Sequence, residues 1–63
     1  MNAQRRSRLQ ALRDELETLA QEEEDAFFNL PESLQGAVNG QQMEANYEAL
    51  QEAVETIDGV LVP

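Results

Sequence analysis

The 63-residue chain contains no cysteine and no histidine. Without cysteine it can form neither disulfide bonds nor thiolate metal sites, and without histidine it lacks the commonest general base and metal ligand of proteins. A chain of this length buries only about 60% of the surface that it exposes when unfolded. Its stability must therefore come from close helix packing or from association with another chain.

Basic residues are few, and they lie in one part of the chain. There is no lysine, all four arginines lie in residues 1–13, and all thirteen acidic residues lie in residues 14–63. The net charge of −9 repels nucleic acid and attracts basic protein surfaces. The cluster Arg5-Arg6-Ser7-Arg8 could contact nucleic acid, but pairing with the chain's own acids, or with those of a second copy, fits the overall charge better. We therefore expect a protein partner, such as a DNA- or RNA-binding protein, and no direct binding to nucleic acid.

The first segment has the pattern of a long amphipathic helix. Its leucines follow a spacing of three, four and three residues, with Phe27 near the same phase. Residues 1–30 contain neither glycine nor proline, and Pro31 disfavours helical geometry at Leu30. The sequence therefore predicts one helix over about residues 3–28.

A short connector, residues 29–39, is predicted to follow. Pro31 suits the first position of a helical turn in the segment PESLQ, and Gly36 would end that turn. Asn39 and Gln42 have the spacing of a capping box, which predicts that a second helix starts directly after Asn39.

The second helix is predicted over about residues 40–58. Gly59 is placed to cap its end, and the short apolar tail of residues 59–63 would cover core or touch a partner. The apolar stripe of this helix keeps a 4-3-4-3 spacing through Met43, Tyr47, Leu50, Val54 and Ile57. The predicted fold class is all-α, a single domain in which two long helices and a short helical connector form a hairpin.

The apolar stripe of the first helix has an internal symmetry. Positions equally far from residue 14 match in character, which predicts that two copies pack antiparallel around a twofold axis. Such a homodimer of hairpins forms a four-helix bundle. Its contact residues would be Arg5, Leu9, Leu12, Leu16, Leu19 and Glu23. In the alternative, a contact within one chain, the arginines lie beside Glu52, Glu55 and Asp58; both contacts can coexist.

No group of residues predicts catalysis. Carboxylate pairs such as Glu22 with Asp25, or Glu48 with Glu52, need a cleft and burial to shift their pKa before they act as general acids or bases. A hairpin this small offers little cleft. The acidic run at residues 22–25 lacks the glycine turn and ligand spacing of an EF-hand. We expect no enzyme activity, no metal site and no cofactor.

The stronger signal is a row of acids on the second helix. At 100° per residue, four glutamates fall within about 80° of one another, opposite the apolar stripe: Glu44, Glu48, Glu52 and Glu55. Three acids of the first helix also face outward: Asp14, Glu17 and Asp25. Carboxylates one turn apart are about 6 Å apart along the axis, similar to phosphates along a nucleic-acid strand. The row is either a solubilising surface or a mimic of nucleic acid.

Phe28 lies about 140° from the centre of the first helix's apolar face, so this helix alone leaves its ring in water. The main expectation is that the connector folds back over Phe28 through Leu34 and Val38. In the alternative, Phe28 docks onto a partner, and the other apolar residues available for docking are Val60, Leu61 and Val62.

Residues 22–35 carry a recognisable motif. It reads E-E-x-x-A-[FY]-x-N-[LIM]-P-E-[SN]-L-Q and resembles the centre of small acidic helical proteins of phages and mobile elements. The shared layout is a basic start, a leucine-spaced helix and an acidic second helix. The resemblance implies a mobile-element origin and a place in the cytoplasm of a bacterial host cell. No apolar run approaches the length of a membrane span.

Two functions are consistent with these features. The first is a non-enzymatic inhibitor that presents its acidic face to a nucleic-acid-binding host protein, as anti-CRISPR proteins and other anti-defence mimics of nucleic acid do. The alternative is a self-associating helical interaction or regulatory module, either an adaptor or an antitoxin-like subunit, that docks through apolar residues. Binding of the first kind weakens steeply with salt, whereas binding of the second kind tolerates it.

Overall fold

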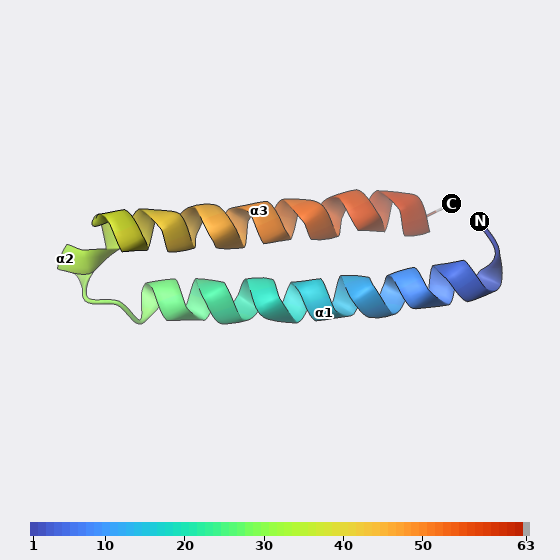
Figure 1. Ribbon diagram of the computed structural model, residues 1–63, viewed down its shortest axis with the longest axis horizontal. Coiled ribbons are helices and arrows are strands. Elements are labelled where there is room, and N and C mark those ends of the chain that lie inside the picture. Colours follow the sequence, from blue (N-terminus) through green and yellow to red (C-terminus); the bar gives the residue numbers. More distant parts are fainter. Residues whose placement is uncertain (63) are drawn as a thin grey trace.

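The computed structural model describes residues 1–62 and shows two long antiparallel helices joined by a short one (Figure 1). α1 spans Ala3–Phe28, α2 spans Glu32–Gln35 and α3 spans Val38–Leu61. The start of α1 and the end of α3 lie at one end of the rod, and α2 lies at the other. The rod extends 48 × 14 × 13 Å. The chain thus has the all-α hairpin fold that the sequence predicts.

α1 occupies the predicted range. Asn2 caps its start, because the Asn2 side-chain oxygen accepts a hydrogen bond from the backbone N–H of Arg5 at 2.8 Å. At the other end the N–H of Asn29 still bonds back into the last turn, but Leu30 precedes Pro31 and leaves helical geometry. The proline therefore sets the end of the helix.

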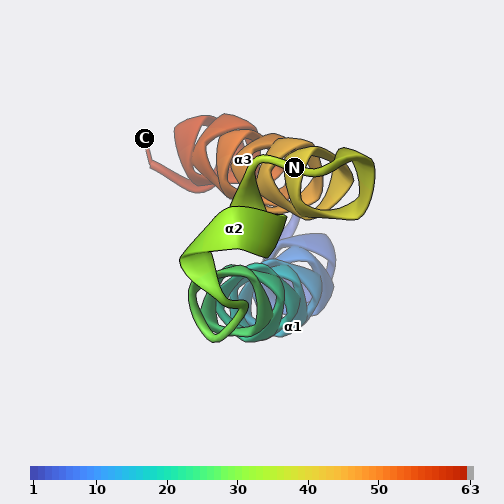
Figure 2. The ribbon, with the colours of Figure 1, turned by 90° about the vertical axis from the view of Figure 1, so that its left-hand side faces the viewer.

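The connector is a single helical turn between two bends. The carbonyl of Pro31 accepts a hydrogen bond from the N–H of Leu34 at 2.8 Å, so Pro31 precedes α2 and does not occupy its first position. Gly36 ends the turn, as predicted. The Gln35 side-chain amide donates to the carbonyl of Leu30 at 3.1 Å. Figure 2 shows α2 lying across the ends of the two long helices.

α3 starts at Val38 and not at residue 40. Ala37, in extended geometry, is the N-cap and offers no side-chain hydrogen bond. Asn39 lies inside the helix, so the predicted capping box with Gln42 does not form. The chain has already turned into the helix at Ala37, whose carbonyl accepts the N–H of Gln41 at 2.9 Å.

α3 also ends later than predicted. Gly59 has no positive φ and the helix runs through it to Leu61, so Gly59 is not the C-cap. The guanidinium of Arg6 donates to the carbonyl of Leu61, which satisfies one of the acceptors left open at the helix end. The predicted tail of residues 59–63 is therefore largely helix; its last residue, Pro63, lies outside the described residues.

Gly40 brings the connector against the first turn of α3. It is buried, and a Cβ atom at this position would lie under 3.0 Å from the carbonyl oxygens of Leu34 and Gln35. These are backbone atoms, which cannot swing aside as a side chain can. The close approach holds α2 over the helix ends, because only glycine leaves room for it.

The core is a narrow seam between α1 and α3. Within residues 1–62 the buried apolar side chains are Ala20 and Phe27 of α1 and Tyr47 and Val54 of α3. The rings of Phe27 and Tyr47 pack with their centroids 5.8 Å apart. The rest of the predicted α3 stripe is half-buried along the same seam: Met43, Leu50 and Ile57.

The leucines of α1 are less covered than their spacing suggests. Leu12 is 57% exposed and Leu19 is 47% exposed, whereas Leu9 and Leu16 are half-buried. Ala20 occupies the seam in their place. α1 is therefore rotated so that its leucines flank the seam on one side instead of filling it.

Candidate functional site

The seam divides the hairpin into two unlike sides, which are the candidate binding surfaces. We call one the acidic side; it comprises Glu44, Glu48, Glu52 and Glu55 of α3 with Asp14, Glu17 and Asp25 of α1. We call the other the apolar side; it comprises Leu12, Leu16 and Leu19 of α1 with Leu50, Ala53 and Ile57 of α3. The helical period of 100° per residue places the members of each set on a common face.

Contacts across the seam show how the two helices are aligned. On the acidic side the Gln51 amide donates to the carboxylate of Glu24 at 3.0 Å. On the apolar side the Asn46 amide donates to the carboxylate of Glu23 at 3.2 Å. The predicted acids of the two helices therefore lie on the same side of the molecule, and the leucines lie on the opposite side.

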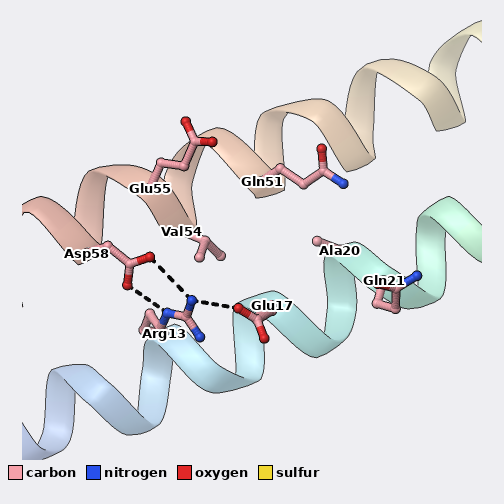
Figure 3. A pocket seen from close by; sticks show the side chains of 8 residues that line it. All are labelled: Arg13, Glu17, Ala20, Gln21, Gln51, Val54, Glu55 and Asp58. Atoms are coloured by element: carbon pink, nitrogen blue, oxygen red, sulfur yellow. Dashed lines mark hydrogen bonds and ion pairs between the residues drawn. The ribbon is translucent and has the colours of Figure 1, made fainter.

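A shallow groove of about 280 Å³ runs along the acidic side between α1 and α3. Figure 3 shows its lining: Arg13, Glu17, Ala20, Gln21, Gln51, Val54, Glu55 and Asp58. Arg13 is the one basic side chain in this lining. It reaches across from α1 to α3 at one end of the groove.

Arg13 is held by several carboxylates. Its Nε lies 2.7 Å from Oδ1 of Asp58 and its Nη2 lies 3.3 Å from Oδ2, a two-point contact between the long helices. Its Nη2 also lies 2.6 Å from Oε2 of Glu17, and its Nη1 lies 3.3 Å from Oδ1 of Asp14. This confirms one part of the alternative reading, the pairing of an arginine with Asp58; Glu52 and Glu55 take no part in it.

These contacts shift the pKa of both partners. The hydrogen bond from Arg13 lowers the pKa of Asp58 below its ordinary value, although partial burial opposes the shift. The hydrogen bond to Asp58 raises the pKa of Arg13, so the guanidinium stays charged. Arg13 therefore serves to join the helices, and it leaves no open cation in the groove for an anionic ligand.

The four glutamates of α3 are in a different position from the acids of α1. Their side chains are exposed, and within residues 1–62 none of their carboxylates accepts a hydrogen bond or pairs with an arginine. On α1, by contrast, Asp14 and Glu17 contact Arg13, and Asp25 accepts a hydrogen bond from Gln21 at 3.0 Å. The uncompensated charge of the acidic side is therefore concentrated on α3.

The negative charge of this row also affects Tyr47, which lies in the seam. Burial raises the pKa of the Tyr47 phenol, and the nearby carboxylates of Glu44, Glu48 and Glu24 raise it further. All of these disfavour a negative phenolate. Tyr47 is therefore a packing residue of the core whose ring edge borders the acidic side.

The apolar side carries a hollow with a largely hydrophobic wall, lined by Leu19, Glu23, Asn46, Ala49 and Leu50. The residues that α3 turns toward this side are uncharged from Asn46 to Val60. Arg5 and Glu23 mark the two ends of the leucine row on α1. Within residues 1–62 Arg5 has no acidic partner, and the Glu23 carboxylate takes only the Asn46 amide.

Phe28 is 61% exposed, so the main expectation, that the connector covers it, is wrong. Its ring touches Phe27 edge-on, with centroids 5.1 Å apart. The connector lies over the helix ends instead, where the close approach at Gly40 holds it, and leaves Leu34 48% and Val38 82% exposed. The remaining docking candidates, Val60 to Val62, lie at the opposite end of the rod, so they do not form one surface with Phe28.

The sequence interpretation missed Arg13 and Ala20 as seam residues. A signal for them exists: Arg6, Leu9, Arg13, Leu16, Ala20 and Phe27 follow the heptad-like spacing of a helix that faces one neighbour. The leucines themselves form a neighbouring stripe, which is the one that their spacing predicts as the buried face. Arg13 is the charged residue in the middle of the heptad-like spacing, and Asp58 is an acid at the same level of the other helix. Such a combination indicates an ion pair across the seam.

Comparison with known protein families, with curated proteins and with solved structures finds no match to this chain. In the part that the structure describes, no helix is long and apolar enough to cross a membrane. The same residues contain no group of three or more acidic side chains that could hold a metal ion. The function is therefore argued from the two sides themselves.

Proposed function

We propose that the chain is a non-enzymatic binding protein that presents its acidic side to the basic, nucleic-acid-binding surface of another protein and blocks that surface. The observation that supports this proposal is the row of α3 glutamates, exposed and without a cation within residues 1–62. On a helix, acids at this spacing repel one another by a few tenths of a kcal/mol per pair. A basic groove relieves that repulsion on binding.

The shape of the molecule suits such a target. The row lies on one face of a straight helix in a rod 48 Å long, and successive turns repeat about every 5.4 Å. A rigid row of charges loses little conformational entropy when it docks. Complementary charge also speeds the encounter with a basic partner.

The proposed setting follows from the motif at residues 22–35. Its resemblance to proteins of phages and mobile elements supports an anti-defence role in the bacterial cytoplasm, with a CRISPR effector or another host nuclease as the class of target. The charge argument requires only that the target bind nucleic acid through a basic surface.

The proposal is tested by competition. The chain is immobilised, a bacterial lysate is passed over it at low salt, and the retained nucleic-acid-binding proteins are identified and assayed against a DNA duplex. Glu48→Lys with Glu52→Lys should abolish competition with DNA without unfolding the hairpin. Glu22→Lys with Glu32→Lys is the matched control, because it makes the same change in net charge away from the row. If the row variant still competes with DNA, the proposal fails.

A second candidate is a self-associating helical module, and it is favoured by a separate observation. Leu12 and Leu19 are about half exposed, next to the uncharged face of α3. Association through this side would persist in salt that removes binding by the acidic side. The two candidates use opposite sides of the hairpin, so one molecule can have both properties.

A further inference from the structure

We propose that the apolar side binds a second copy of this chain, with α1 of one copy antiparallel to α1 of the other and the twofold axis at residue 14. The inference develops the self-association proposed above, and it does not depend on what the acidic side binds. It specifies the partner, the register and the residues of α3 that join the contact.

The exposed leucines are the reason to expect that another molecule packs against the apolar side. Leu12 and Leu19 lie in a row that the seam leaves open, and α3 continues this surface through Leu50, Ala53 and Ile57. The whole molecule extends 48 Å by 14 Å along its two longer axes, which bounds the size of this face. This is of the order of the roughly 800 Å² per partner that a standard protein interface covers.

Charge complementarity identifies the cover as a second copy. Arg5 stands at one end of the leucine row without an acidic partner within residues 1–62, and Glu23 stands at the other end in the same phase. An antiparallel copy brings Arg5 to Glu23 of the second copy, and the twofold axis repeats this pair at the other end. The register also places Leu12 against Leu16 of the second copy.

The opposite arrangement, in which two hairpins lie side by side with both connectors at one end, lacks this match. It brings the arginine-rich starts of both α1 helices together, so Arg5 and Arg8 of one copy face the same residues of the other. Like charges brought together in this way disfavour the contact. The charge pattern therefore selects the antiparallel pair.

The seam also fixes what α3 contributes. The ion pair between Arg13 and Asp58 sets these residues at the same level of the rod, so an axis at residue 14 crosses α3 near Ile57. The side chain of Ile57 is half-buried and flanked on the apolar side by Ala53 and Val60. The axis therefore brings Ile57 near Ile57 of the second copy, and the small side chain of Ala53 leaves room for the helices to approach closely.

The arrangement has a consequence for binding. In this dimer the two apolar sides face each other, so the two acidic sides point outward in opposite directions. Each copy keeps its row of glutamates and its Arg13–Asp58 pair free of the contact. The dimer thus offers two equivalent acidic faces, one for each of two partner molecules.

A charge-swap experiment tests the register. Arg5→Glu and Glu23→Arg each place two like-charge contacts in their own homodimer, which should raise the dimer dissociation constant about tenfold. When the two variants are mixed, both contacts become attractive, so native mass spectrometry should show mainly the heterodimer. The double variant Arg5→Glu with Glu23→Arg should restore the homodimer. A statistical mixture of dimers would overturn the antiparallel register.

A leucine pair tests the surface. Leu19 and Leu34 are exposed almost equally, at 47% and 48%, but Leu34 belongs to the connector and lies outside the proposed contact. Leu19→Asp should weaken the dimer about 100-fold or more, because two apolar contacts per dimer are replaced by charge, and Leu34→Asp should leave it unchanged. Sedimentation equilibrium measures both, with circular dichroism as the check on folding. A wild-type chain that remains monomeric at millimolar concentration, or equal effects of the two variants, would overturn the proposal.

A distance measurement separates the two orientations. Because the chain contains no cysteine, Gln4→Cys carries a single nitroxide label at an exposed position on α1. The antiparallel dimer places the two labels about 30 Å apart along the axis. The arrangement with both connectors at one end brings them to about 20 Å or less, and that result would overturn the proposed register.

Discussion

The two sides of the hairpin are built from the same two helices, but they differ in how many of their side chains find partners within one chain. On the acidic side the cross-seam groups are matched: Arg13 makes two contacts with Asp58, and Gln51 reaches Glu24. On the apolar side, Leu12 and Leu19 remain exposed. The contact of Arg13 with Asp58 thus ties the helices together on the acidic side, whereas on the apolar side two large apolar side chains stay in contact with water.

The difference originates in where the acids fall on α3. The helix turns Glu44, Glu48 and Glu55 to one side of the seam and uncharged residues to the other. Repulsion on the acidic side keeps that face in water or against a basic partner. The lack of charge on the opposite face removes the main barrier to association there. The two sides thus differ in charge and in apolar exposure, which is the basis of the two proposed contacts.

Removing the seam should abolish both sides at once, which is the largest effect we expect. Phe27→Ala deletes a ring that is 5% exposed, at a cost of about 3–5 kcal/mol in the free energy of unfolding. A domain of this size has only about 3–9 kcal/mol in total, so much of the helical circular dichroism should be lost at 25 °C.

The adjacent phenylalanine is the matched control. Phe28 is 61% exposed, so Phe28→Ala should cost less than about 1 kcal/mol. Urea unfolding at one fixed protein concentration compares the two variants, since the proposed dimerisation would make stability concentration-dependent. Equal losses would show that Phe28 is covered, contrary to the structure.

The next effect concerns the connector, which sets how the helices meet. Gly40→Ala puts a Cβ under 3.0 Å from backbone oxygens and should cost about 1–3 kcal/mol by overpacking. Gly36→Ala meets nothing within 4 Å and should be neutral or stabilising by about 0.4–1 kcal/mol. Thermal unfolding measures both. If Gly40→Ala stabilises the protein, as alanine does at a solvent-exposed helix position, then the backbone of Leu34 and Gln35 does not lie as close to residue 40 as the structure shows.

The sequence predicts the architecture well because the strongest local signals agree with it. The lack of glycine and proline before Pro31 defines α1, and the 4-3-4-3 spacing defines the buried stripe of α3. The ends of α3 were predicted less well. Asn39 and Gly59 are residues typical of helix caps, but packing against the connector and the bond from Arg6 to the Leu61 carbonyl extend the helix past both.

The rotation of α1 could not be read from leucine spacing alone. Two stripes on this helix lie about 60–80° apart, one leucine-rich and one containing Arg13 and Ala20. The neighbour decides which stripe becomes the seam. Here Asp58 favours the stripe with Arg13, and small Ala20 lets α3 approach. The sequence contains both residues, but their importance depends on a contact 45 positions apart in the chain.

Loss of the arginine pair should weaken only the acidic side. Arg13→Gln removes the contacts to Asp58 and Glu17, so it should destabilise the hairpin by less than Gly40→Ala, and the loss should shrink in high salt. The pKa of Asp58 is lowered in the folded state. Ionised Asp58 therefore stabilises the fold at pH values above its ordinary pKa of about 4, and this stabilisation disappears as the pH falls through the lowered pKa.

A pH series of unfolding midpoints tests this sign. The gap between wild type and Asp58→Asn should be constant from neutral pH to about pH 5 and should close below about pH 4. Asp25→Asn is the control, because Asp25 accepts a bond only from neighbouring Gln21 and should show a smaller gap throughout. A gap that widens on acidification would contradict the assigned pair.

The smallest effect is a gain in stability from the α3 row. Glu48 has acids four residues away on both sides, Glu44 and Glu52, and each like-charge pair costs about 0.2–0.5 kcal/mol. Glu48→Gln should therefore stabilise the hairpin by about 0.5–1 kcal/mol in low salt, and screening in 0.5 M NaCl should reduce the gain. Glu15→Gln makes the same change in net charge, but Glu15 has no acid three or four residues away. If both variants gain the same free energy of unfolding, the net charge limits stability and the arrangement of the row does not. That result would contradict the idea that the row of glutamates is a specific arrangement of charges.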